Sequence, residues 1–210
     1  MTGAAALSGS VELLDRSLAY TRVMLADVRP DNLDRPTPCA GWTLGHLLAH
    51  MEDALDAFTE AAAGRVEVEP VPPTTTRVEA LREKACALLG AWTAARPASE
   101  QVEVGDLELD APLLVATAAL EITVHGWDVG QATGRRTRIP DDLAERLMAV
   151  AQHVIDAADR GPRFASPRPA QPDAASDVRL LSWTGRAPAH MTEPLRGNSG
   201  EPTARRGRAS

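Results

Sequence analysis

The residues best suited to chemistry lie in the segment EITVHGWD, residues 121–128. Glu121 and His125 are four residues apart, so in a helix they lie one turn apart on the same face. Leu114 and Ala118 precede them on that line and are apolar, so we expect the face to pack inward. A buried carboxylate is costly unless it has a partner. A divalent metal ion is one such partner, and a Glu–His pair at the surface is the simpler alternative.

A second pair of histidines has the same spacing, His46 and His50 in TLGHLLAHM. His50 is next to Leu47 and Met51, on or beside an apolar stripe, whereas His46 points inward less clearly. A core histidine bonded to a backbone carbonyl is the simpler interpretation of either residue alone. Two helices that each bring such groups inward can form a site with three protein ligands, His/Glu/His. That site suits zinc, nickel, iron(II) or manganese and leaves a coordination position open, as in catalytic metal sites.

Helical periodicity predicts the elements that position these residues. Apolar residues recur at intervals of three, four and seven, and the predicted helices cover about 11–28, 43–63, 76–92, 112–133 and 141–155. A short hairpin is expected around Gly105-Asp106, and a short apolar element within 177–186. Four principal helices indicate an all-α fold, an antiparallel four-helix bundle. We expect residues 1–188 to form this single metal-binding domain and residues 189–210, rich in Pro, Gly and Arg, to be a disordered tail.

Composition narrows the classes of partner. The 210 residues carry a net charge of −7, which argues against a nucleic-acid binder. No apolar run reaches the roughly 20 residues that a membrane-spanning helix needs, and the N-terminus lacks the basic stretch of a signal peptide. We therefore expect a cytoplasmic protein with a small-molecule substrate and no nucleic-acid or membrane partner. An alanine-rich helix face leaves a homodimer open.

The two cysteines are too few for a disulfide framework or a cysteine-based zinc site. A metal here must therefore use nitrogen and oxygen ligands. Cys86, in the middle of a predicted helix, is expected in the core. Cys39 is expected to be a small packing residue, with a reactive thiol near a helix start as the alternative.

Three motifs in order resemble a known family. They are PTPCAGWTLGHLLAHM, then EITVHGWDVGQATG about seventy residues later, then DVRLLSWTGR. Together they resemble the DinB-like superfamily, and more closely the mycothiol-dependent maleylpyruvate isomerase N-terminal-domain group of actinobacterial metal-binding proteins. The resemblance covers about residues 10–188, and it implies a DinB-like four-helix bundle that carries a divalent metal.

The resemblance also implies roles for individual residues. Carried over by motif, the metal ligands are His50, Glu121 and His125, which agrees with the spacing argument. Asp128 belongs to the HGWD pattern and is expected to orient the helix or its histidine. His46, Trp42 and Trp127 are candidates for positions beside the ligands or in the pocket. No catalytic residue is assigned beyond the metal centre itself.

Characterised relatives use the metal to ionise the thiol of mycothiol or bacillithiol. The thiolate then adds to an electrophile, or adds and leaves to isomerise a double bond. The isomerase itself has a further C-terminal domain, whereas only RLLSWTGR and a tail follow the fifth helix here, so S-transfer is favoured over isomerisation. Zinc is the favoured metal, with nickel, iron or manganese as alternatives.

A non-catalytic metal-binding module and a metal-dependent hydrolase are the other functions considered. Arg35, Arg135 and Arg136 are candidates to pair with the carboxylate of a thiol cofactor.

Overall fold

A computed structural model describes residues 3–63, 77–94, 101–104, 107–161 and 163–188. The tail at 189–210, the turn at Gly105-Asp106 and the first residue of the third predicted helix, Thr76, lie outside these residues. The helices in the described part are α1 (Gly3–Met24), α2 (Leu44–Ala62), α3 (Arg77–Ala94), α4 (Ala111–Thr133), α5 (Asp141–Val154) and α6 (Ser176–Trp183), with short 3₁₀ turns at Leu25–Asp27 and Pro30–Asn32. None of them is both long and apolar enough to cross a membrane.

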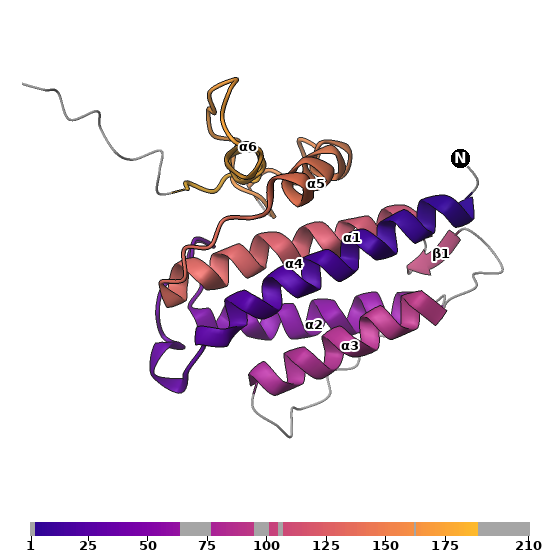
Figure 1. Ribbon diagram of the computed structural model, residues 1–210, viewed down its shortest axis with the longest axis horizontal. Helices are drawn as coiled ribbons and strands as arrows, with labels where there is room; N and C mark the ends of the chain where they lie inside the picture. The colour runs from indigo at the N-terminus through magenta and orange to yellow at the C-terminus, as the bar shows by residue number, and fades with distance from the viewer. Residues whose placement is uncertain (1–2, 64–76, 95–100, 105–106, 162, 189–210) are drawn as a thin grey trace, which may run out of the picture.

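The predicted four-helix bundle is confirmed, and α1 to α4 form it in two layers (Figure 1). α1 packs on α4, and α2 packs on α3. Within each pair the helices are parallel. Thr21 of α1 bonds to Ile122 of α4, and further along both helices Met24 lies against Gly130. The α1–α4 pair runs antiparallel to the α2–α3 pair.

The contacts of α2 with α3 show the same parallel direction. Arg77 of α3 pairs with Glu52 of α2, and Trp92 near the other end of α3 donates to the carbonyl of Phe58. α3 therefore runs in the same direction as α2, and its first turn lies beside the middle of α2. α2 also packs on α4, which brings His50 of α2 beside Glu121 of α4.

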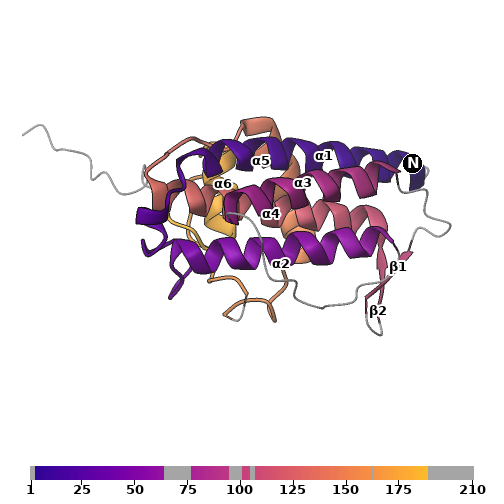
Figure 2. The same ribbon diagram turned by 90° about the horizontal axis from the view of Figure 1, so that it is seen from below.

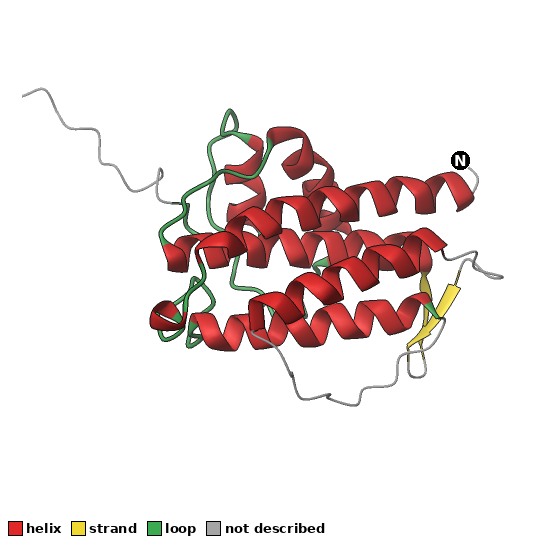
Figure 3. Ribbon diagram, turned by 60° about the horizontal axis from the view of Figure 1, so that its bottom comes forward, coloured by secondary structure: helices red, strands yellow, loops and turns green. Residues whose placement is uncertain are grey.

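Two smaller units complete the fold. α5 and α6 lie against the α1–α4 layer, on the side away from α2 and α3 (Figure 1). Strands β1 (Gln101–Val104) and β2 (Leu107–Asp110) form the predicted antiparallel hairpin, which lies at the end of the bundle where α1 begins (Figure 2). Figure 3 shows that the loops gather at the opposite end. Val102 of the hairpin is buried against the core.

The local signals at helix ends act as the sequence predicts. Thr43 caps α2, its hydroxyl accepting a hydrogen bond from the backbone N–H of His46 at 3.3 Å. Gly134 ends α4 in the left-handed conformation, with φ of 91°. These caps set where α2 begins and where α4 ends, so they fix the register of the residues that face each other between the two helices.

The close packing of α1 on α4 depends on Gly126. A Cβ atom at this position would lie 2.3 Å from Oγ1 of Thr21 and 3.2 Å from its Cα. Thr21 is itself buried and bonded to the backbone of α4, so it has little room to move. Because Gly126 has no side chain, the backbones of α1 and α4 can come close together at the residue next to His125.

We expect Gly126→Ala to lower the free energy of unfolding by about 1–3 kcal/mol, the usual cost of overpacking. The matched control is Gly90→Ala on α3, where a Cβ would meet no atom within 4 Å. That substitution should instead stabilise the protein by about 0.5–1 kcal/mol through helix propensity. Urea unfolding of both variants measures the contrast. Equal effects of the two substitutions would contradict the close approach.

Candidate metal centre

Three side chains from α2 and α4 converge where the two helix centres meet. His50 of α2 and Glu121 and His125 of α4 place one donor atom each within 4.8 Å of the other two. His50 Nε2 is 3.0 Å from Glu121 Oε1. The rings of His50 and His125 meet edge to face, with centroids 5.1 Å apart. The three residues with the spacing noted in the sequence thus form one cluster.

The chemistry of this donor set fits a divalent metal. Two ligand atoms at about 2.1 Å from a tetrahedral metal lie about 3.4 Å apart, which falls within the range of separations in the cluster. One carboxylate oxygen and two imidazole nitrogens suit zinc, nickel, iron or manganese. Three protein ligands also leave room for a further ligand from outside the protein.

Asp128 orients His125 from the other side of the ring. Its Oδ2 lies 3.2 Å from Nδ1 of His125, so a proton on Nδ1 leaves Nε2 as the free electron pair. Asp128 is completely buried and also accepts from Arg186, with Nη2 to Oδ2 at 2.8 Å. The carboxylate therefore holds both the tautomer and the orientation of the histidine, as in many metal sites.

Two carboxyl groups in the centre are held in the charged form. Burial pushes the pKa of Glu121 upward, but its hydrogen bond with His50 and the nearby His125 bring it below its ordinary value. Burial also opposes ionisation of Asp128, and the charge of Arg186 with the bond to His125 lowers the pKa of this carboxyl. Both groups are thus anionic at neutral pH, which is the form that a metal ligand and its orienting partner need.

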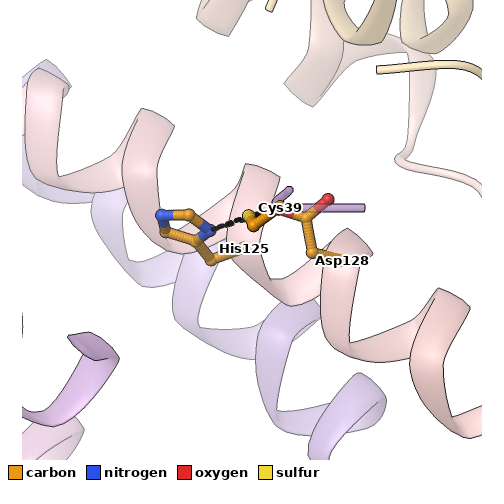
Figure 4. A group of neighbouring side chains, drawn as sticks. All are labelled: Cys39, His125 and Asp128. Atoms are coloured by element: carbon orange, nitrogen blue, oxygen red, sulfur yellow. Dashed lines mark hydrogen bonds and ion pairs between the residues drawn. The ribbon is translucent and has the colours of Figure 1, made fainter. Parts of the chain in front are cut away.

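The side chain of Cys39 lies between those of His125 and Asp128 (Figure 4). Its Sγ lies 3.2 Å from Oδ2 of Asp128, to which it donates, and 3.8 Å from Nδ1 of His125. Burial and the negative charge of Asp128 raise the pKa of the Cys39 thiol to about 12. The neutral thiol here is a hydrogen-bond donor and not an anionic ligand.

Cys39, His125 and Asp128 are also close enough to hold a metal, but the charge around them argues against it. The guanidinium of Arg186 lies 3.5 Å from the sulfur and binds both oxygens of Asp128. A cation at that position would be repelled at short range in a buried setting. The cluster of His50, Glu121 and His125 is the better metal site.

The donors of this cluster line a cavity of about 520 Å³. It lies between α2, α4 and segments outside the bundle at residues 38–42, 161, 163–165 and 184–186. Trp42 stands at its edge, 37% exposed, with its ring 5.0 Å from that of His50. Arg163 and Arg186 add two positive charges to the lining. A small molecule that enters here meets all three donors.

The comparison with known proteins gives the family. The model of the mycothiol maleylpyruvate isomerase N-terminal domain matches residues 14–130, more than half of the chain. The chain belongs to this family. Two uncharacterized proteins of Mycobacterium tuberculosis, from strains CDC 1551 / Oshkosh and ATCC 25618 / H37Rv, are each 27% identical over 169 residues, which cover 78% of this chain and 90% of theirs. No solved structure matches the chain.

In this member of the mycothiol maleylpyruvate isomerase N-terminal domain family, the remaining candidate residues lie elsewhere in the fold. His46 is exposed in the first turn of α2, with Nδ1 3.5 Å from the backbone nitrogen of Thr43. Trp127 is buried in the core cluster, and neither residue lines the cavity. Cys86, expected in the core, is exposed on α3, because it lies on the edge of the apolar stripe of that helix.

The three arginines considered for a cofactor carboxylate do not line the cavity either. Arg135 pairs with Asp27 at 2.6 Å, and Arg35 donates to the carbonyl of Ala132. Arg136 is exposed in the loop after α4. All three lie near the end of α4, since Arg35 contacts Ala132 and the other two follow Gly134. The arginines at the cavity come from the segments after α5 instead.

Arg186 is the site residue that the sequence reasoning missed. It follows α6, and its side chain is almost completely buried beside Asp128. Gly185 makes the turn that aims it, with φ of 82°, and a Cβ there would lie 2.6 Å from Ala165. The backbone N–H of Arg186 donates a hydrogen bond to the carbonyl of Leu181 at 2.8 Å and so caps the end of α6. The only signal in the sequence was the TGR that ends the third motif.

Proposed function

We propose that this protein is a metal-dependent enzyme that activates a small thiol cofactor, of the mycothiol type, for S-transfer to an electrophile. The convergence of His50, Glu121 and His125 on a cavity open to small molecules is the observation that carries this proposal. The family supports it, because its name links the domain to a mycothiol-dependent reaction. A divalent metal, when bound, would lower the pKa of the thiol and so supply a nucleophile at neutral pH.

The chain's own residues have distinct parts in this proposal. His50, Glu121 and His125 would hold the metal, and Asp128 keeps the proton on Nδ1 of His125 so that Nε2 is free to be a ligand. Arg163 is exposed at the cavity and bonded to Asp159 at 3.1 Å, and it is placed to donate hydrogen bonds to hydroxyl or amide oxygens of the cofactor. The side chain of Trp42 covers one side of His50 and restricts the entry of water there.

The test uses the full chain loaded with zinc, mycothiol as the thiol and monobromobimane as the electrophile. In this reaction the sulfur forms a bond to the bromine-bearing carbon, bromide leaves with its electron pair, and the thiol proton goes to solvent. We expect conjugate to form at least about tenfold faster than without protein, because a free thiol is only a few per cent ionised at neutral pH and the thiolate is the nucleophile. The zinc-free protein and a Glu121→Gln variant are the controls and should show only the spontaneous rate.

A rate that does not exceed the spontaneous one, in protein shown to hold about one metal per chain, would contradict thiol activation. That result would favour a non-catalytic metal-binding module or a hydrolase. Competition among zinc, nickel, iron(II) and manganese for the purified protein identifies the metal, for which zinc is our expectation because the donors are two imidazoles and one carboxylate.

A further inference from the structure

A second cavity, of about 420 Å³, lies between the helices of the bundle and has no part in the function proposed above. It is lined by residues of α1, α2, α3 and α4, opens to solvent beside the exposed Arg22 and Arg82, and its walls are mainly apolar. The large apolar side chains that line it include Leu18, Leu25, Met51, Leu55, Leu81 and Ile122. A cavity of this size and lining suits a small organic molecule.

The second cavity meets the first at the candidate metal centre. Glu121 and His125 line both cavities, whereas His50, Trp42 and Arg186 line only the first. A molecule in the second cavity would therefore contact two of the three proposed ligands from the side opposite the C-terminal segments. Two reactants can reach the same centre at once, one from each cavity, as a bimolecular transfer requires.

The charges at the second cavity indicate which molecule it would hold. Arg22 of α1 and Arg82 of α3 line it and are exposed, and neither has a hydrogen bond or ion pair within the described residues. Two acidic residues also line the cavity, and one of them, Glu121, belongs to the metal centre. The other is Asp15, so Arg22, Arg82 and Asp15 together carry one net positive charge. Guanidinium groups bind carboxylates and sulfonates through paired hydrogen bonds.

We propose that the second cavity binds the electrophile, and that this reactant is an apolar molecule with a single anionic group. Its apolar body lies among the leucines between α1 and α3, its anionic group lies at Arg22 and Arg82, and its reactive carbon is directed toward Glu121 and His125. This assignment rests on the proposed thiol transfer. In that step the thiol S–H bond breaks and a C–S bond forms, the leaving group departs with its electron pair, and the proton goes to solvent.

The test measures binding of 8-anilinonaphthalene-1-sulfonate, an aromatic molecule with one sulfonate, to the full chain with and without zinc. We expect the double variant Arg22→Gln/Arg82→Gln to weaken its Kd by about tenfold or more, since two charge-assisted bonds are lost. The matched control is Arg179→Gln. Arg179 is also exposed but lies on α6, away from this cavity, and its loss should change the Kd by less than about twofold.

The two cysteines report the place of binding, because Cys86 lines the second cavity and Cys39 lines the first. The probe should slow the alkylation of Cys86 by N-ethylmaleimide, followed by peptide mass spectrometry, and leave the rate at Cys39 unchanged. An unchanged Kd in the double variant, or no protection of Cys86, overturns the assignment.

These results are separable from those for the proposed function. Monobromobimane carries no acidic group, so its conjugation does not need Arg22 and Arg82. Conjugation that occurs while the probe tests fail overturns only the role of the second cavity. Arginine-dependent binding without any conjugation upholds this cavity as a site for an apolar anion but overturns its assignment to the electrophile of a thiol transfer.

Discussion

Replacement of any one of His50, Glu121 and His125 by alanine should lower zinc affinity by more than about 100-fold. Loss of a residue that only orients a ligand typically costs 10–100-fold, and removal of a ligand itself should cost more. The three donor atoms lie within 4.8 Å of one another, and no other residue of this cluster can replace a missing one. Titration of the purified variants against a zinc-binding dye measures the affinity.

Three further variants make this experiment specific. His46→Ala removes an imidazole from the same helix as His50, but His46 is exposed and four residues away, so the affinity should not change. Asp128→Asn should cost about 10–100-fold, because it weakens the orientation of His125. Cys39→Ser should leave the affinity almost unchanged. A large effect of Cys39→Ser with little effect of His50→Ala would show that the metal lies in the other cluster.

Much of the fold could be predicted from local signals in the sequence. The Thr43 cap and the left-handed Gly134 act within a few residues of themselves, and the apolar periodicity of each helix reflects one buried face. The apolar periodicity predicts a first helix that begins near Val11, whereas α1 begins at Gly3. The first turns of α1 consist mainly of small residues, so they have little periodicity. Helix pairing could not be read in this way. That α1 lies parallel to α4 depends on contacts between residues about a hundred positions apart, such as Thr21 and Ile122.

The same distinction applies to the site. Glu121 and His125 are four residues apart on one helix, so the sequence alone places them on one face, and the motif then selects His50. Arg186 is 58 residues from Asp128, in a chain with many arginines, and nothing local marks it as buried. The sequence does not predict the second cavity for a similar reason, since Arg22 of α1 meets Arg82 and Cys86 of α3 only when the two helices pack.

The pair of Asp128 and Arg186 should be the most sensitive point of the fold. Arg186→Leu leaves the carboxylate of Asp128 buried without its countercharge, which typically costs about 3–5 kcal/mol. For a chain of this size that is a decrease in Tm of about 6–20 °C. Thermal unfolding of the metal-free protein measures it, since a bound metal would add its own stabilisation. The double variant Arg186→Leu/Asp128→Asn should recover most of the loss, because no charge then remains unpaired.

The pH dependence separates this electrostatic effect from a simple loss of packing. In the wild type the folded pKa of Asp128 lies below its ordinary value, so its stabilising contribution is complete at neutral pH. It is lost only as the pH falls through that lowered pKa. Without Arg186, burial dominates and the pKa of Asp128 rises above its ordinary value, so acidification relieves the penalty by protonating the carboxylate. The difference in Tm between wild type and Arg186→Leu should therefore be smaller at pH 5 than at pH 8. A difference that stays constant over this range would show that Arg186 stabilises the C-terminal segment by packing alone.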